Sequence, residues 1–502
     1  MTSQERDNCF PFLAMHLYKL NKMSEYSSSE FEQQEFKDAL AQYEEMIKGN
    51  ATSYFDADQF ADFAEYYLSK GRYKDAMQVI DNALKIHPDS SEILVIQAHI
   101  LIDQNKINEA KAIVRCIGED SIEVQLLEAE LFLVEKKPEE AERIFIDMIE
   151  TRDDMDREDY KSIVYLYEDF DMPEKAIEWF EKAILLFPQE DYMLMDMALC
   201  YVETGNTEKA IKMLNDLIDA NPYESEYWYG LGKIYYMTDN YNKAIEAYEF
   251  VLTIEPEHSK AILMMAHCYF KLENYEESAQ FYLKYSTFEP ESEMPLFFCA
   301  LCHFTSEKFD QALLYFKEAL QKVQEGSPQL IDIYSYIALT YSKMNNIDEA
   351  LNYIDLAIRQ DESCADSYIY KGRFYLYAEN AEKAIECFDK AIAIDPNDMK
   401  VYNDLGITYF ECKDYPMAIE AFRKIAETDP GYGLSNIYLA YLYLQVGDRR
   451  NFQKFFIEAV KEAPEKILDF LGYLPDEETG VKQLIINLKA AIEQDLKDGQ
   501  ID

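Results

Sequence analysis

The sequence predicts an all-α protein: a right-handed superhelical solenoid of about twelve helix-turn-helix units with capping helices at its ends. The first observation is a repeat of 34 residues, marked by prolines at positions 188, 222, 256 and 290 and again at 396, 430 and 464. The second is that small residues recur at two fixed places within this repeat. The third is that Gly and Pro number only 15 each among 502 residues, too few for turn-rich β folds.

The small residues mark where the two helices of each unit cross. Antiparallel helices approach closely only where one presents a small side chain to the other. On the predicted first helix the position is small except at Val164: Ala64, Ala98, Ala129, Ala198, Gly232, Ala266, Ala300, Ala338, Gly372, Gly406 and Ala440. On the predicted second helix it is small except at Phe452: Ala76, Ala110, Ala141, Ala176, Ala210, Ala244, Ser278, Ala312, Ala350, Ala384 and Ala418.

One unit carries the pattern in nearly complete form. Counting back from Pro256, the residues that match W-x2-L-G-x2-Y…A-x3-F…P are Trp228, Leu231, Gly232, Tyr235, Ala244 and Tyr248. This resembles the tetratricopeptide repeat family, and the frame extends over twelve units from about Ala57 to Lys466. The resemblance implies pairs of antiparallel helices whose first members form a continuous concave surface. Protein or peptide segments are the ligands that such a surface is expected to hold.

Breaks in the 34-residue frame predict the domain organisation. Residues 1–56 are expected to form an N-terminal helical lead, 57–326 units 1 to 8, 327–466 a loop and units 9 to 12, and 467–502 a C-terminal capping helix. The spacing from Ala300 to Ala338 grows to 38, and the extra residues fall near Gly326 and Pro328, where a hinge is expected. The amphipathic stretch from Val481 to Leu496 is expected to cover the last apolar face.

The charge balance narrows the class of partner. With 96 Asp and Glu against 48 Lys and Arg, the formal charge is −48, which argues against nucleic acid as a partner. No run of about eighteen apolar residues predicts membrane insertion, and the N-terminus has no basic start or cleavage pattern of a signal peptide. The nine cysteines lie mostly in apolar helical stretches, which favours buried thiols in the cytoplasm.

An enzyme is the main alternative from another class. The stretch from Cys299 to His303 spells C-x-x-C-H, a haem attachment motif, but it falls inside a predicted first helix, where buried thiols are the favoured interpretation. A zinc site would have to add His267 and Cys268, which point in different directions on one helix. We therefore predict a non-enzymatic scaffold or adaptor with no cofactor, catalytic or metal residues. The open alternatives are a metal- or haem-dependent enzyme using this region and a regulatory subunit of a separate enzyme.

The resemblance also implies which residues face the groove, because ligand contacts in that family commonly come from positions 2, 5, 6, 9, 12 and 13 of a unit. Over the first five units these positions are strongly acidic and are opposed only by Lys161; they include Glu168, Asp169 and Glu203 and the predicted acidic groove residues Asp58, Asp62, Glu65, Glu123, Glu130 and Asp196. Such a wall favours a basic segment.

From the sixth to the eighth unit the same positions are apolar and mildly basic. The predicted peptide-binding residues here are Tyr229, Lys233, Tyr236, Lys260, Leu263, Met264, His267, Phe270, Phe297, Phe298 and Phe304. Aromatic and methionine side chains beside a few cations suit a peptide with hydrophobic anchors. The alternative is that these side chains only pack neighbouring helices together.

Overall fold

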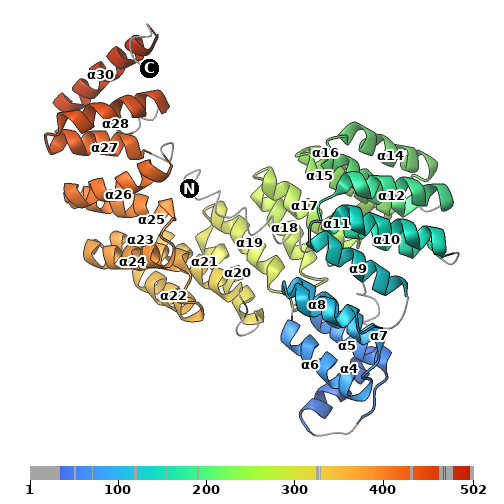
Figure 1. Ribbon diagram of the computed structural model, residues 1–502. Helices are drawn as coiled ribbons and strands as arrows, with labels where there is room; N and C mark the ends of the chain where they lie inside the picture. Colours follow the sequence, from blue (N-terminus) through green and yellow to red (C-terminus); the bar gives the residue numbers. More distant parts are fainter. Residues whose placement is uncertain are drawn as a thin grey trace. The chain divides into compact units, whose positions relative to one another are not determined.

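The computed structural model describes residues 34–49, 53–69, 72–117, 121–152, 155–188, 191–323, 327, 329–429, 434–462, 467, 470 and 479–497. These described residues form 26 helices and no strand (Figure 1). The chain divides into two compact units, Met1–Ala261 and Ile262–Asp502. From here on, unit 1 and unit 2 mean these two parts, and the 34-residue units of the sequence are called repeats or helix pairs. The division falls in the first turn of a helix.

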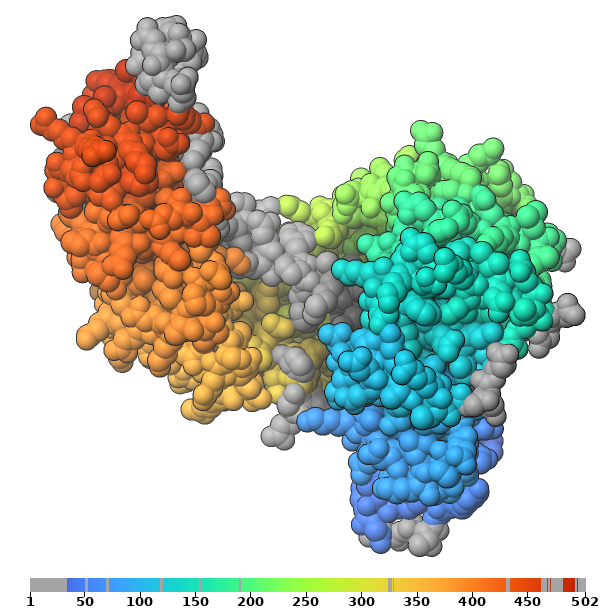
Figure 2. Space-filling view, in the orientation of Figure 1, coloured from blue at the N-terminus to red at the C-terminus, as the bar shows by residue number. Residues whose placement is uncertain are grey.

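Unit 1 begins with α4 (Gln34–Ile47) and continues as six helix pairs. The pairs are α5 (Ala57–Ser69) and α6 (Tyr73–Ile86), α7 (Ser91–Asp103) and α8 (Ile107–Val114), α9 (Ile122–Val134) and α10 (Pro138–Thr151), α11 (Arg157–Asp169) and α12 (Pro173–Leu186), α13 (Asp191–Glu203) and α14 (Thr207–Ala220), and α15 (Ser225–Met237) and α16 (Tyr241–Ile254). Each pair also packs against the next in sequence. In the space-filling view the colours of unit 1 accordingly follow one another from blue to green (Figure 2).

Unit 2 contains six more pairs and a final helix. They are α17 (Ser259–Lys271) and α18 (Tyr275–Tyr285), α19 (Met294–Thr305) and α20 (Phe309–Lys322), α21 (Gln329–Lys343) and α22 (Ile347–Gln360), α23 (Ala365–Tyr377) and α24 (Ala381–Ile394), α25 (Met399–Glu411) and α26 (Tyr415–Thr428), α27 (Ser435–Gln445) and α28 (Arg449–Glu462), and α30 (Thr479–Lys497). The twelve described pairs confirm the predicted all-α repeat architecture, and α30 contains the predicted capping segment.

The crossing of the two helices in a pair explains the small residues. A Cβ added at Gly232 would lie 2.4 Å from the buried ring of Tyr248 on the second helix of the same pair. In unit 2 the corresponding distances are 2.5 Å from Gly372 to Phe388 and 2.8 Å from Gly406 to the ring of Phe422. These rings are fully buried. The glycine on the first helix therefore leaves room for the aromatic side chain of the second helix at the crossing.

The turn between the paired helices also repeats. One residue there adopts a positive φ in eleven pairs: Asn105, Lys136, Asp171, Gly205, Asp239, Glu273, Glu307, Asn345, Glu379, Lys413 and Gly447. In the sixth pair the Asp239 amide donates to the Tyr236 carbonyl at 3.1 Å and the Asn240 amide donates to the Tyr235 carbonyl at 2.8 Å. These bonds satisfy the last carbonyls of the first helix before the second begins.

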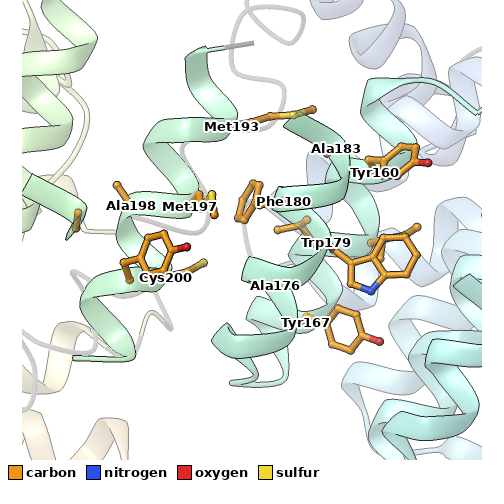
Figure 3. Packing of buried hydrophobic residues seen from close by; sticks show 14 of the residues in the cluster. Tyr160, Tyr167, Ala176, Trp179, Phe180, Ala183, Met193, Met197, Ala198 and Cys200 are labelled. Carbon is orange, nitrogen blue, oxygen red and sulfur yellow. The ribbon is translucent and has the colours of Figure 1, made fainter. Parts of the chain in front are cut away.

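Large aromatic side chains fill the space around these crossings. Between α11, α12 and α13, the rings of Tyr167, Trp179 and Phe180 lie inside one apolar cluster (Figure 3). The Trp179 indole donates to a carboxylate oxygen of Glu142 at 3.3 Å, and the Tyr167 hydroxyl donates to the same oxygen. The buried polar edges of both rings are thereby satisfied.

The predicted hinge lies at the limit of what the structure describes. Gly326 and Pro328 fall outside the described residues, while α20 and α21 on either side of them pack against each other. The predicted break at this loop stays a prediction.

No helix among the described residues is long and apolar enough to cross a membrane.

Candidate functional site

Unit 1 contains a groove with a volume of about 780 Å³. All of its lining residues lie on first helices of five consecutive pairs: Val95 and His99 on α7; Glu123, Leu126 and Glu130 on α9; Ser162, Tyr165, Leu166, Glu168 and Asp169 on α11; Asp196, Leu199, Cys200 and Glu203 on α13; and Lys233 and Met237 on α15. The first helices therefore build this surface of unit 1, as the resemblance implies.

The groove has an apolar component and an acidic one. Each of α9, α11 and α13 contributes one leucine to the lining, namely Leu126, Leu166 and Leu199. The same three helices contribute six carboxylates, which are Glu123, Glu130, Glu168, Asp169, Asp196 and Glu203. A concave wall that concentrates one sign of charge focuses its potential on whatever enters.

At one end of the groove, His99 and Glu130 form a pair across α7 and α9. The Nδ1 atom of His99 lies 2.9 Å from a carboxylate oxygen of Glu130, and 48% of the His99 side chain remains open to solvent. Burial among the groove walls opposes a positive charge on His99, but the hydrogen bond and charge of Glu130, with the charges of Asp103 and Glu65, raise its pKa overall. One groove carboxylate thus already interacts with a cationic group when His99 is protonated.

In the middle of the groove, Glu168 on α11 faces α13. The Cys200 thiol donates to a carboxylate oxygen of Glu168 at 3.0 Å. Burial, together with the negative charges of Asp196, Glu203 and Asp169, raises the pKa of Glu168 to about 7, although the bond from Cys200 opposes the rise. Glu168 is therefore a carboxyl group that changes charge near neutral pH.

Other polar side chains of α11 and α13 lie in the lining beside Glu168. The Tyr165 hydroxyl donates to a carboxylate oxygen of Asp196 at 3.4 Å, which links α11 to α13. Burial and the charge of Asp171 raise the pKa of Glu203. Burial also raises the pKa of the Cys200 thiol, with the Glu168 charge adding to the effect, so this sulfur remains a neutral thiol.

The six predicted acidic residues divide into two groups. Glu123, Glu130 and Asp196 line the groove. Asp58, Asp62 and Glu65 lie on α5 and are not among its lining residues. They form an acidic cluster with Glu92 on α7, whose pKa is raised by burial, by the charge and hydrogen bond of Asp58, and by the charges of Asp62 and Glu65. Ligand binding by either group stays a prediction.

Several lining residues were not among the predicted site residues. Five of them stand at position 5 or 9 of their repeats, counted in the same frame: Val95, His99, Leu126, Tyr165 and Leu199. The prediction for this part of the chain rests on the charged residues at these positions. An equal weight on apolar residues would have found Leu126 and Leu199 in the floor of the groove, but not Leu166, which stands at position 10 of its repeat.

Four of the predicted peptide-binding residues lie in unit 1: Tyr229, Lys233, Tyr236 and Lys260. Of these, Lys233 lines the groove. The Tyr229 ring packs 5.2 Å from the ring of His258, and the Tyr236 ring lies edge-on to Tyr241 at 5.5 Å.

The remaining predicted residues lie in unit 2, on α17 and α19. Leu263 is half-buried, whereas the exposed fractions of the other six are between 1% and 7%: Met264, His267, Phe270, Phe297, Phe298 and Phe304. The Phe298 ring stacks on Tyr282 at 5.3 Å, and the Phe297 ring lies edge-on to Tyr336 at 5.4 Å. These contacts give the aromatic residues a packing role, and their contact with a ligand stays a prediction.

The C-x-x-C-H stretch is buried on α19. Cys302 donates to the Ser278 hydroxyl at 3.3 Å, and burial raises its pKa to about 12. Burial likewise raises the pKa of Cys299. The His303 ring stacks on Tyr315 at 5.4 Å, and burial lowers its pKa. Among the residues that the structure describes, no group of three His, Cys, Asp or Glu side chains could hold a metal ion.

Comparison with protein-family models gives three matches. Residues 159–410, about half of the chain, match the family described as N-terminal acetyltransferase A, auxiliary subunit. Residues 32–115 match anaphase-promoting complex, cyclosome, subunit 3, and residues 400–432 match a tetratricopeptide repeat model. No curated protein matches the chain.

Solved structures of helical repeat proteins are similar at low identity. YrrB, described as a TPR protein with an unusual peptide-binding site, is 22% identical, with 38% of this chain and 96% of YrrB covered and a TM-score of 0.32. Yeast Tom70 is 16% identical, with 80% and 98% covered and a TM-score of 0.39. The Cut9–Hcn1 hetero-tetramer of APC/C has a chain that is 13% identical, with 82% and 94% covered and a TM-score of 0.35.

The twelve described helix pairs, the small residues at their crossings and the family matches agree with one another. The chain belongs to the tetratricopeptide repeat family.

Proposed function

We propose that this protein is a non-enzymatic scaffold that holds segments of partner proteins against the concave faces of its first helices. The observation that carries the proposal is the groove of unit 1, which five consecutive first helices line with both apolar and charged side chains. In a groove that binds a protein segment, apolar side chains supply contact area and charged side chains supply specificity. The predicted peptide-binding residues are proposed to contact such segments in each unit separately, Lys233 among them within the groove of unit 1.

Site-specific photo-cross-linking tests the scaffold proposal in the native cell. The photoreactive residue p-benzoylphenylalanine is placed at position 166 on the floor of the groove or, as a control, at position 185 on α12, where Leu185 is 84% exposed. We expect cross-links to defined segments of partner proteins from position 166 and not from position 185. Equal cross-linking from both positions, or none from 166, would contradict the proposal.

A second candidate function is that of an auxiliary subunit of a separate enzyme. The match of residues 159–410 to the auxiliary subunit family of N-terminal acetyltransferase A favours it. In this case the chain would contribute binding while another polypeptide performs the chemistry.

Acetyl transfer by the purified complex tests this candidate. A tagged chain is isolated with its partners and incubated with labelled acetyl-CoA and peptides that have free N-termini, beside a mock purification from untagged cells. Label on the peptides above the mock supports the candidate, and its absence from an eluate that contains partner proteins argues against it.

The predicted cytoplasmic location and the predicted exclusion of nucleic acid stay predictions.

A further inference from the structure

Charge is unevenly distributed along the groove of unit 1. The three middle helices, α9, α11 and α13, carry all six lining carboxylates and no lining cation. The helices at the two ends carry the basic side chains of the lining, His99 on α7 and Lys233 on α15. The acidic section therefore has one basic side chain at each end.

The same three helices provide the apolar floor. Leu126, Leu166 and Leu199 line the groove and are partly buried against the apolar cluster beneath it. Each leucine has carboxylates of its own helix in the same lining. A ligand must therefore satisfy apolar surface and negative charge together, which distinguishes this groove from a solvated acidic surface.

We propose that the section of the groove formed by α9, α11 and α13 binds an extended basic segment of a partner protein in which Lys or Arg alternates with apolar residues. This inference rests on the proposed scaffold function and specifies the chemistry of its ligand. Neighbouring packed helices lie about 10 Å apart, so three of them span roughly 20 Å. An extended chain covers that distance with about six residues.

Charge complementarity selects this occupant. Entry of a neutral segment would take solvent from Glu168, Asp196 and Glu203 without returning a charged partner. An acidic segment would add repulsion to carboxylates that already raise the pKa of Glu168. Lys or Arg supplies both the charge and the donors, while apolar residues between them reach the leucines. When it is protonated, His99 meets one of these carboxylates in this way, with its Nδ1 atom 2.9 Å from an oxygen of Glu130.

Peptide binding to the full chain tests the inference. The probe is a fluorescein-labelled peptide with six alternating Lys and Leu residues between Gly-Ser flanks, compared with peptides in which Gln or Glu replaces Lys. Fluorescence anisotropy at low salt is expected to show the Lys peptide binding at least about tenfold more tightly than the Gln peptide, as three favourable charge pairs would produce. The Glu peptide is expected not to bind.

Two matched variants distinguish the groove from the overall negative charge. The groove variant carries Glu168→Gln, Asp196→Asn and Glu203→Gln. The control carries Asp147→Asn, Asp216→Asn and Glu246→Gln on exposed positions of α10, α14 and α16, so that it loses the same number of carboxyl groups. The Lys peptide should lose about tenfold in affinity for the groove variant and almost none for the control, and circular dichroism verifies that both variants fold.

The outcomes separate this inference from the scaffold proposal. Equal affinity for the Lys and Gln peptides, or equal loss in both variants, overturns the basic-segment inference. If position 166 still cross-links to partner segments, the scaffold proposal survives that result. If position 166 captures nothing and no peptide binds, both fall.

Discussion

The first helices of unit 1 and those at the start of unit 2 follow the same repeat frame but present different surfaces. On α11, Glu168 and Asp169 line an open groove. On α19, Phe297 and Phe298 stand at predicted groove positions of their 34-residue repeat, yet their exposed fractions are only 4% and 2%. Repeat position determines the side of the helix on which a residue lies, but side-chain type and neighbours determine whether that residue remains accessible. The comparison teaches that an acidic position in this frame marks a surface better than an aromatic one.

The largest expected effect comes from the aromatic side of the comparison. Phe298→Ala should destabilise unit 2 by about 3 to 5 kcal/mol, because it removes a buried ring that stacks on Tyr282. Both tryptophans of the chain, Trp179 and Trp228, lie in unit 1, so their fluorescence reports on unit 1 while circular dichroism reports on the whole chain.

In urea, the unfolding of Phe298→Ala followed by circular dichroism should begin at lower denaturant, with the tryptophan transition almost unchanged. Such behaviour is expected of a repeat protein whose parts unfold separately. A variant as stable as the natural chain would place Phe298 among accessible groove residues and break the comparison.

The crossings test what the two regions share. Gly232→Ala in unit 1 and Gly372→Ala in unit 2 should each cost about 1 to 3 kcal/mol, because the added methyl group meets a buried ring in both. The measurement is urea unfolding by circular dichroism, with Gly205→Ala as a comparison at a glycine that meets no neighbour but has a φ of +78°. A cost in only one unit would show that the framework itself differs between them.

A titration tests the acidic side of the comparison. The pKa of Glu168 rises from its ordinary 4.5 to about 7 on folding, so the folded state retains a proton that the unfolded state releases. Stability should therefore fall as the pH increases from about 4.5 to 7. Glu168→Gln removes this fall and should be more stable than the natural chain by about 1 to 2 kcal/mol at pH 8, and equal to it at pH 4.5. Parallel stability curves for the two proteins between pH 4.5 and 8 would contradict this assignment.

The smallest effect concerns the turns. Glu273, in unit 2, has a φ of +61°, which costs a residue with a Cβ more than it costs glycine. Glu273→Gly should stabilise the chain by roughly 0.5 kcal/mol, because relief of this strain slightly exceeds the entropy that glycine loses. Lys136→Gly in unit 1, at a φ of +59°, is the matched measurement and should give the same small gain in thermal unfolding. A loss of stability in either variant would show that the natural side chain makes a compensating contact.

Much of the fold could be predicted because the same steric requirement recurs at a fixed spacing in the sequence: a small residue must stand where two helices cross. Gly232 opposite Tyr248 and Gly372 opposite Phe388 follow from how closely two helices must approach, and this requirement recurs in every repeat. The non-glycine turn residues could not be predicted in the same way. Lys136 and Glu307 adopt positive φ because the packed helices on both sides require it, against their own preference.

Less of the candidate site could be predicted. Glu123, Glu130 and Asp196 were predicted from position alone, and the structure places them along one groove. The raised pKa of Glu168 was not predictable, since it depends on burial and on three carboxylates from two helices. The burial of Phe298 could not be predicted either, because aromatic side chains at this spacing are compatible both with ligand binding and with packing in a core.

The repeated turn has a consequence for how such a chain can change over generations. Because nearly every pair closes through the same backbone geometry, a whole 34-residue repeat can be gained or lost without disturbing the junctions that remain. Each such event lengthens or shortens the groove by one first helix, about 10 Å, or roughly three residues of extended ligand. If the proposed segment binds along the groove, the number of repeats between His99 and Lys233 determines how many of its residues the first helices can contact.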